Sequence, residues 1–118
     1  MGKENHIPRR GDLVWIYART GDGSIQSSAR SAVVLSPESY NRRVGLAIFC
    51  PVSDEEKGYP FEVAIPVGMP ASGVVLADQL ESVAWQSCAL EPICSLPAEI
   101  TDAVLQKAAA LLEREDGP

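Results

Sequence analysis

The chain has 118 residues, of which 46% are hydrophobic and 22% are charged, a balance typical of one soluble globular domain and not of a disordered or fibrous chain. No apolar run reaches the roughly 18 residues that a membrane helix needs, and the polar N-terminus is unlike a signal peptide, so we expect a cytoplasmic protein. The net charge of −6 argues against a general nucleic-acid binder.

The first half of the chain predicts three strands separated by polar segments. Residues 12–18 are apolar, with β-branched and aromatic side chains, and predict the first strand. Residues 19–30 hold almost nothing to bury, so we expect a long, mobile surface loop there. Residues 31–36 form a short apolar run typical of a buried central strand, residues 37–43 have the composition of a turn, and residues 44–52 predict the third strand.

The second half predicts three further strands. A second polar loop, residues 53–60, leads to residues 61–65, whose alternating pattern predicts a half-exposed strand. Residues 74–78 predict a fifth strand and residues 82–90 a sixth, so we expect the β body to end near Leu90.

The period of the apolar residues changes from Pro97 onward, which predicts a C-terminal helix over about residues 97–115. The residues that fall on one face of this helix are Ile100, Val104, Leu105, Ala108, Leu111 and Leu112. Together the elements predict a mainly β fold with α (α+β) in one domain over residues 1–118. It would be a small, bent antiparallel sheet or partial barrel of five or six strands, closed by the helix. Residues 1–9 are expected to be a flexible tail.

The common catalytic motifs are absent. His6 is the only histidine and lies in the expected tail, which argues against a Ser/His/Asp triad, a Cys/His dyad or a histidine-based zinc site. Cys50, Cys88 and Cys94 are an odd number without CxxC spacing, so we expect reduced, structural thiols. The acidic run at residues 54–56 is interpreted as solvated loop charge, and no metal or cofactor is expected.

The charge is segregated along the chain. Residues 1–50 carry seven Lys and Arg against four Asp and Glu, whereas residues 51–118 carry three against twelve. Charges act on a bound polyanion only within about 8–10 Å at physiological salt, so a basic N-terminal half can offer a positive surface on an acidic molecule. The arginines that would form it are Arg9, Arg10, Arg19, Arg30, Arg42 and Arg43.

Four segments of the chain carry distinctive motifs. They are RGDLVWI (residues 10–16), AVVLSPESYN (residues 32–41), KGYPFEV (residues 57–63) and GVVLADQLESVAW (residues 73–85). In this order and spacing they resemble MazF/PemK-type toxins of bacterial toxin–antitoxin pairs, and the resemblance covers about residues 10–115. It implies a CcdB/MazF-like fold and a homodimer that acts as a sequence-specific endoribonuclease on single-stranded RNA without a metal. The implied protein partner is a cognate antitoxin.

The chemistry implied by this resemblance needs few groups. The ribose 2′-OH attacks its own phosphodiester, so the enzyme must fix sugar and phosphate in line, stabilise phosphoryl charge and move protons. The resemblance implies that Arg30 stabilises the charge on the phosphoryl group, because its planar guanidinium can bind two phosphate oxygens. It also places Ser53 where the family commonly has a threonine. The alternative interpretations are a surface arginine beside a loop and a serine that closes a turn.

Further residues are candidate RNA contacts by the same resemblance. They are Gln26 in the first loop, Lys57 and Tyr59 in the KGYP turn, and Asp78 and Gln79 after the fifth strand. A lysine and an aromatic ring suit the backbone and the bases of single-stranded RNA. Alternatively, Tyr59 packs the turn and Asp78 bonds backbone amides at a strand end. The tryptophans Trp15 and Trp85 are interpreted as core or dimer-interface residues.

The chain departs from the family pattern at several positions. Ile25 stands where many members have the acidic residue of a G-x-E-Q loop, and Ser31 replaces the proline that usually follows the arginine. Ile25 cannot move a proton, so Asp22 and Asp54 from the flanking loops are the alternative bases. These departures leave open a CcdB-like toxin that binds DNA gyrase without catalysis, or a weakened family member that acts through binding.

Overall fold

The computed structural model describes residues 6–114 as a curled antiparallel sheet of seven strands with two α-helices. In chain order the elements are β1 (Asp12–Arg19), β2 (Ile25–Val34), α1 (Glu38–Val44), β3 (Ala47–Ser53), β4 (Glu62–Ala64), β5 (Val74–Leu76), β6 (Glu81–Val83), the 3₁₀ turn η1 (Trp85–Ser87), β7 (Cys88–Ser95) and α2 (Ala98–Ala110). The bent sheet and the C-terminal helix predicted from the sequence are confirmed. Neither helix in the described part of the chain has the length and apolar character needed to cross a membrane.

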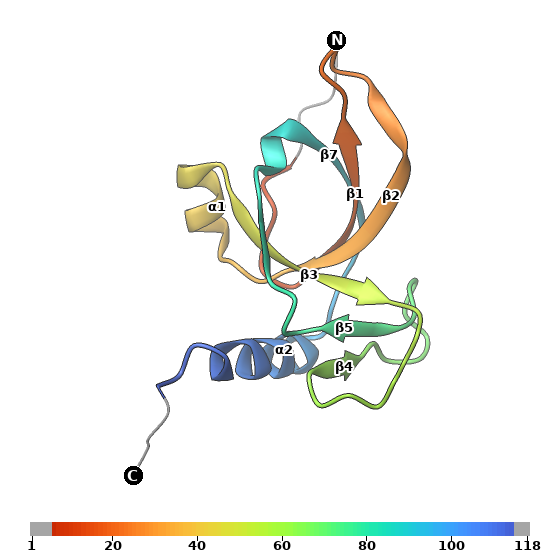
Figure 1. Ribbon diagram of the computed structural model, residues 1–118, viewed down its shortest axis with the longest axis vertical. Helices are drawn as coiled ribbons and strands as arrows, with labels where there is room; N and C mark the ends of the chain where they lie inside the picture. Colours follow the sequence, from red (N-terminus) through yellow and green to blue (C-terminus); the bar gives the residue numbers. More distant parts are fainter. Residues whose placement is uncertain (1–5, 115–118) are drawn as a thin grey trace.

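The curl of the sheet arises at β3. The strands follow the order β4-β5-β3-β2-β1-β7, and all paired strands are antiparallel. β6 lies off this path and pairs with the first part of β3, whereas the end of β3 pairs with β5. Figure 1 shows β1, β2, β3 and β7 curling toward one another, with β4, β5 and α2 together at one end. The strand that exchanges neighbours therefore joins the two parts of the fold.

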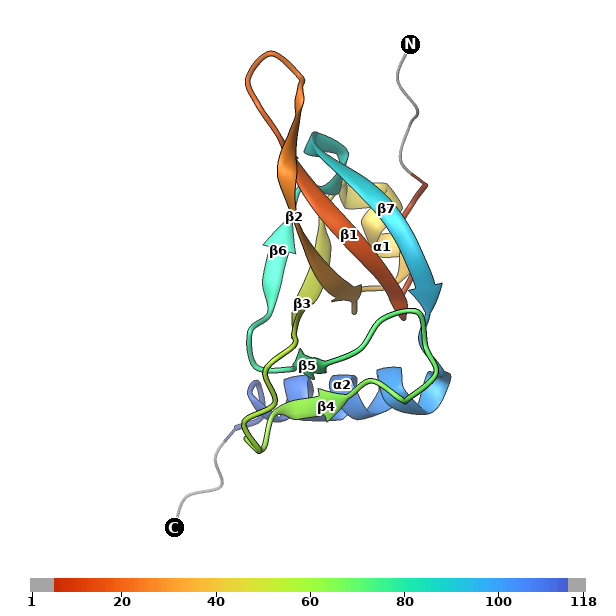
Figure 2. The same cartoon turned by 90° about the vertical axis from the view of Figure 1, so that its right-hand side faces the viewer.

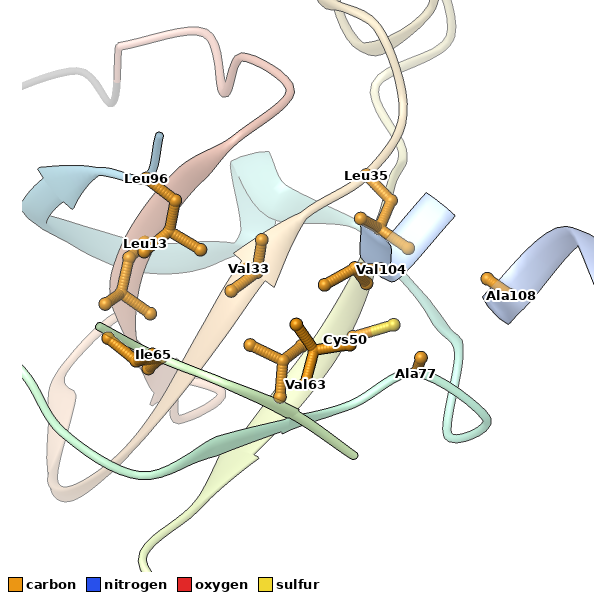
Figure 3. Close-up of a cluster of buried hydrophobic side chains, with 11 residues drawn as sticks. Leu13, Val33, Leu35, Cys50, Val63, Ile65, Ala77, Leu96, Val104 and Ala108 are labelled. Atoms are coloured by element: carbon orange, nitrogen blue, oxygen red, sulfur yellow. The ribbon is translucent and has the colours of Figure 1, made fainter. Parts of the chain in front are cut away.

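Buried apolar side chains form two clusters on opposite faces of the central strands. Leu13 and Val33 belong to the cluster beside α2, whose side chains converge from β1, β2, β3, β4 and α2 in Figure 3. Their chain neighbours Val14 and Val34 belong to the second cluster. A strand buried on both faces gives an unbroken apolar run, so the strand predicted over residues 31–36 was recognisable; its residues 31–34 end β2, and Leu35 and Ser36 follow the strand.

Helix α2 covers the first cluster with Val104 and Ala108, which lie one helical turn apart. The helix ends at Ala110, earlier than the predicted end near residue 115, and Leu112 is 80% exposed. The apolar stripe thus continues past the part of the helix that packs on the sheet, and periodicity alone overestimates the helix length. Residues 115–118 lie outside the described residues.

Residues 25–30, expected as part of a mobile loop, are the first half of β2. They are exposed, but they pair with β1 down to the pair Arg19–Ile25. Backbone hydrogen bonds to β1 hold these residues in a strand although their side chains are not buried. Their polar composition therefore wrongly indicated a loop. The loop is only the hairpin tip, residues 20–24, which Figure 2 shows extending beyond the rest of the sheet.

Residues 37–43, expected as a turn, contain most of helix α1. Glu38 lies in its first turn, and Arg42 and Arg43 lie in its last, which suits the helix dipole. Gly45 ends the helix in the left-handed conformation, with a φ of 77°, and donates its N–H to a carbonyl of the last turn at 3.0 Å. The charge placement and the terminal glycine were helix signals that the Ser, Asn and Pro content concealed.

The predicted strand over residues 82–90 is in fact two strands separated by η1, and β7 continues to Ser95. Trp85 is buried, as expected for a core residue, and its indole N–H donates to the Asn41 carbonyl at 3.1 Å where the chain turns. β7 is the last strand of the path and lies beside β1, so its other edge has no partner strand among the described residues. Pro92 lacks an N–H group, and on that edge its absence costs no hydrogen bond between strands. The described residues therefore form seven strands instead of five or six.

A buried asparagine joins several separate segments. The Nδ2 of Asn41 donates to the Pro8 carbonyl at 2.8 Å and to the Ser36 carbonyl at 3.1 Å. Its Oδ1 accepts from the Ser36 hydroxyl at 2.6 Å, and that hydroxyl accepts from the Ile48 N–H at 2.8 Å. This network connects the N-terminal segment, the end of β2, α1 and β3. Residues 1–5 of the expected tail lie outside the described residues, whereas Pro8 is buried.

We predict that Asn41→Ala lowers the free energy of unfolding by about 1–3 kcal/mol, because the buried Pro8 and Ser36 groups lose their partner. Urea unfolding followed by circular dichroism measures the change. Ser39→Ala is the matched control, since Ser39 is exposed on the same helix, and it should stay within about 0.5 kcal/mol of the wild type. Wild-type stability of Asn41→Ala would contradict the role given to this network.

Candidate active site

Arg30 lies in the exposed first half of β2, opposite Ile16 of β1. Its Nη1 donates to Oε2 of Glu81 at 2.7 Å, and its Nη2 donates to Oε1 of the same carboxylate. This bidentate hydrogen bond raises the pKa of Arg30 and lowers the pKa of Glu81. The two side chains are 49% and 41% exposed, so Arg30 is a charged group that a polyanion can reach.

Glu81 is a candidate site residue that sequence reasoning missed. It lies in β6, 51 positions from Arg30, inside one of the segments that carry the family resemblance. The two residues meet because β2 and β6 both pair with β3. No local pattern indicates such a contact, and the only available signal was an acidic residue within a segment already singled out.

Ser53 ends β3 and closes the loop that follows. Its Oγ accepts the Glu55 N–H at 3.1 Å and donates to the Glu55 carbonyl at 3.4 Å. These contacts match the interpretation of Ser53 as a turn residue, and its catalytic role stays a prediction. Arg30 and Ser53 each lie two positions beyond Ala32–Pro51, the last pair of β2 with β3. They therefore flank the point where these two strands separate.

A hollow of about 570 Å³ opens where β2 and β3 separate. Trp15, Ala29, Ser31, Ser53, Asp54 and Ile93 are among its lining residues. Its volume is suitable for a ligand the size of a nucleotide. Neighbouring residues of a strand point to opposite faces, so Arg30 leaves β2 on the side away from Ala29 and Ser31. The structure thus brings Ser53 and Asp54 together in the hollow and places Arg30 on the other face of β2.

The two alternative bases differ in their surroundings. Asp22, at the hairpin tip, accepts hydrogen bonds from the Thr20 hydroxyl and the Ser24 N–H, which lower its pKa to about 2. A carboxylate of such low basicity is a poor proton acceptor at neutral pH, and its contacts are those of an Asx turn. Asp54 instead lines the hollow. Gln26 is exposed near the start of β2, next to Ile25, which is 54% exposed.

The KGYP turn is held by a carboxylate of the same chain. The backbone N–H groups of Lys57, Gly58 and Tyr59 all donate to Glu62, at 3.0, 3.0 and 3.3 Å for the shortest contact of each. Tyr59 also packs edge-to-face on Phe61, with ring centroids 6.1 Å apart. These contacts agree with turn packing by Tyr59, which nevertheless remains 37% exposed. RNA contacts by Lys57 and Tyr59 stay predictions.

Asp78 and Gln79 face different surroundings. Oδ1 of Asp78 is buried and accepts no hydrogen bond from residues 6–114, whereas Gln79 is exposed. Burial, together with the negative charge of Asp78, raises the pKa of the Cys50 thiol to about 12, so this thiol stays protonated. Within residues 6–114, Cys50, Cys88 and Cys94 form no disulfide. RNA contacts by Asp78 and Gln79 stay predictions.

The basic residues of the N-terminal half are distributed over several places. Arg9 and Arg42 both pair with Glu38, at 3.3 and 3.6 Å, and Arg19 donates to the Gly23 carbonyl at the hairpin tip. Arg30 instead pairs with Glu81. Within residues 6–114, no group of three or more His, Cys, Asp or Glu side chains is arranged to hold a metal ion.

Comparisons with known proteins agree over most of the chain. Residues 9–112 match the family model described as PemK-like, MazF-like toxin of type II toxin-antitoxin system. The chain is 44% identical over 82 residues to the endoribonuclease toxin MazF of Escherichia coli (strain K12), covering 70% of this chain and 73% of that protein.

Solved structures show the same fold. The crystal structure of MazF (Form-I) from Deinococcus radiodurans is 42% identical, with a TM-score of 0.79, covering 92% of this chain and 98% of that one. A MazE-MazF (Form-II) structure from the same organism is 40% identical, with a TM-score of 0.79, covering 94% and 100%. A mycobacterial endoribonuclease in complex with its cognate antitoxin is 18% identical, with a TM-score of 0.72, covering 89% and 94%, a likeness of fold alone.

We predict that Gly73→Ala destabilises the protein and displaces Ser53. Gly73 has a φ of 122°, and a Cβ at this position would overlap the Ser53 carbonyl oxygen. Gly68→Ala is the matched control, because Gly68 also has a positive φ, of 96°, but open space around it. Thermal and urea unfolding should show that Gly73→Ala costs about 1–3 kcal/mol more than the control. Equal costs would mean that the contact with Ser53 is unimportant.

Proposed function

The chain belongs to the PemK-like, MazF-like family of type II toxins, and we propose that it is the endoribonuclease toxin of a toxin–antitoxin pair. The observation that carries the proposal is the family match over residues 9–112, because it includes the strands that hold Arg30 and Ser53. A relative of 44% identity is named an endoribonuclease toxin, which supports the same activity.

The proposed reaction is cleavage of single-stranded RNA by its own ribose 2′-OH, without a metal ion. Attack on the adjacent phosphorus and loss of the 5′-oxygen leave a 2′,3′-cyclic phosphate and a 5′-hydroxyl. Because nucleophile and phosphorus belong to one nucleotide, the reaction benefits from a high effective molarity. The protein then needs to hold the phosphate in line and to stabilise the charge that develops on its oxygens.

Arg30 is the group best suited to the developing charge, since its guanidinium is always protonated and half exposed. Ser53 and Asp54 lie together in the hollow where β2 and β3 separate, so a nucleotide there would meet both of them on the face of β2 opposite to Arg30. Of the two alternative bases, Asp22 is the less suitable, because its carboxylate is engaged in the turn at the hairpin tip and has a pKa of about 2. Gln26, Lys57, Tyr59, Asp78 and Gln79 remain the proposed RNA contacts.

The proposed protein partners are a second copy of the chain and a cognate antitoxin, in the cytoplasm. Solved complexes of relatives named MazE-MazF support the antitoxin. Trp15 is 38% exposed and lines the hollow with Ile93, so the hollow has an apolar wall that a second protomer can cover. An antitoxin segment with acidic residues would compete with RNA for Arg30.

We predict that the purified, antitoxin-free protein cuts a mixed-sequence RNA in the presence of EDTA. An RNA of the same sequence with 2′-O-methyl groups throughout should stay intact, because it lacks the attacking hydroxyl. Gel electrophoresis and end-group analysis of the products measure both outcomes. Loss of cleavage in EDTA would contradict a metal-independent reaction, and an intact unmodified RNA without EDTA would favour a toxin that acts through binding alone.

We predict that Arg30→Ala lowers the rate of RNA cleavage by about 100–1000-fold, the usual loss when one donor to a developing oxyanion is removed. Single-turnover kinetics at saturating RNA measure the chemical step. Arg43→Ala is the control, since Arg43 is an exposed arginine on α1, and it removes the same charge from another surface. If Arg30→Ala cleaves as fast as Arg43→Ala, the assignment of Arg30 is wrong.

A further inference from the structure

Glu81 reaches Arg30 across β3. Phe49 of β3 pairs with Val34 of β2 on one edge and with Glu81 of β6 on the other, so β2 and β6 flank β3. Arg30 and Val34 are an even number of residues apart on β2 and therefore share a face of the strand. The ion pair thus bridges two strands over the one between them, and both side chains are held in defined orientations.

The carboxylate occupies only one edge of the guanidinium. Glu81 binds the edge formed by the two terminal nitrogens, Nη1 and Nη2. The Nε–H of Arg30 has no acceptor among residues 6–114. The Cys88 side chain lies near the guanidinium, but the Arg30 side chain is 49% exposed, so a second ligand can approach the edge formed by Nε and one Nη. Two oxygens of a phosphate match that edge as well as two carboxylate oxygens match the other.

The ion pair between Arg30 and Glu81 is better suited to orienting the Arg30 side chain than to stabilising the fold. Both side chains are about half exposed, and ion pairs at such positions contribute little to the stability of a fold. A free arginine side chain, in contrast, loses much rotamer entropy when a ligand fixes it. A guanidinium that Glu81 already holds has lost this rotamer entropy before RNA binds. The entropy cost then does not add to the free energy of binding or to the reaction barrier.

The same carboxylate would slow the reaction if it competed with the substrate for Arg30. Glu81 would be a competitor if phosphate could reach Arg30 only by displacing it. The free Nε edge makes displacement unnecessary, and the lowered pKa of Glu81 keeps it ionised and weakly basic, which disfavours a proton-transfer role. Glu81 is the carboxylate that the fold places directly on Arg30.

We propose that Glu81 is a positioning residue for Arg30: it holds one edge of the guanidinium across β3 so that the other edge can bind the scissile phosphate. The proposal rests on the ribonuclease function proposed above. Glu81 acts on the reaction through Arg30 and makes no contact with RNA in this role.

The test separates binding from chemistry in the variants Glu81→Gln and Glu81→Ala. Affinity is measured by fluorescence anisotropy with an RNA that is 2′-O-methylated throughout, and the chemical step by single-turnover cleavage at saturating unmodified RNA. Removal of a negative charge should leave affinity equal or higher, because RNA is a polyanion. The cleavage rate should fall by about 10-fold or more, since misplacement of a group by about 1 Å can cost about 100-fold.

Two controls make the result specific. Glu38→Gln removes the same charge from another exposed ion pair, with Arg9 and Arg42, and should change neither measurement. In an Arg30→Ala background, Glu81→Gln should have no further effect on the rate, because a positioning residue acts only through its partner. Thermal unfolding of each variant checks that the fold is retained.

Each outcome decides something. A cleavage rate of Glu81→Gln equal to the wild type would overturn the positioning role, and a faster rate would identify Glu81 as a competitor of the phosphate. A further loss of rate in the Arg30→Ala background would mean that Glu81 acts independently of Arg30. Failure of the wild type to cut RNA in the same assay would overturn the ribonuclease function itself, and the role of Glu81 with it.

Discussion

The register of β2 between its two neighbours determines where the proposed functional side chains point. β2 pairs with β1 from Val33 down to Ile25 but with β3 only as far as Ala32–Pro51. Because side chains alternate along a strand, Arg30 shares the face of Ala32, whereas Ser31 turns toward the hollow. A slip by one residue would exchange the two faces and separate Arg30 from Glu81. The buried residues after Ser31 prevent that slip, so the apolar run that builds the core also orients the arginine.

The features predictable from the sequence are those with a local signal. The apolar runs of β1, β2 and β3 and the helical period of α2 are such signals, because burial acts on the residues themselves. Residues 25–30 have no such signal, since their strand conformation comes from pairing with β1. Glu81 is the extreme case, because its contact with Arg30 requires β6 to pair with β3 outside the linear strand order. Family resemblance indicated Arg30 and Ser53, but the partner of Arg30 and the separation of the two faces required the fold.

Several carboxylates of this acidic chain are used inside the fold. Glu62 accepts consecutive backbone N–H groups of the KGYP turn, Asp22 accepts two hydrogen bonds at the hairpin tip, and Glu81 binds Arg30. Each of these carboxylates occupies a group of donors that would otherwise suit an external anion. The net charge of −6 is therefore a poor guide to the field near the proposed site, because field strength at a bound phosphate depends on charges within about a Debye length.

A paired arginine also changes how the proposed ribonuclease would divide its interactions between substrate and transition state. Glu81 offsets much of the charge of Arg30, so the attraction to a ground-state phosphate, which carries one negative charge, is weakened. The free edge of the guanidinium still meets the oxygens on which charge accumulates during 2′-OH attack. An interaction that strengthens as the reaction proceeds lowers the barrier, whereas one that is equally strong throughout only tightens binding. Substrate affinity must then come from other groups, and the exposed ring of Tyr59 can supply it by stacking on a base, which depends less on charge.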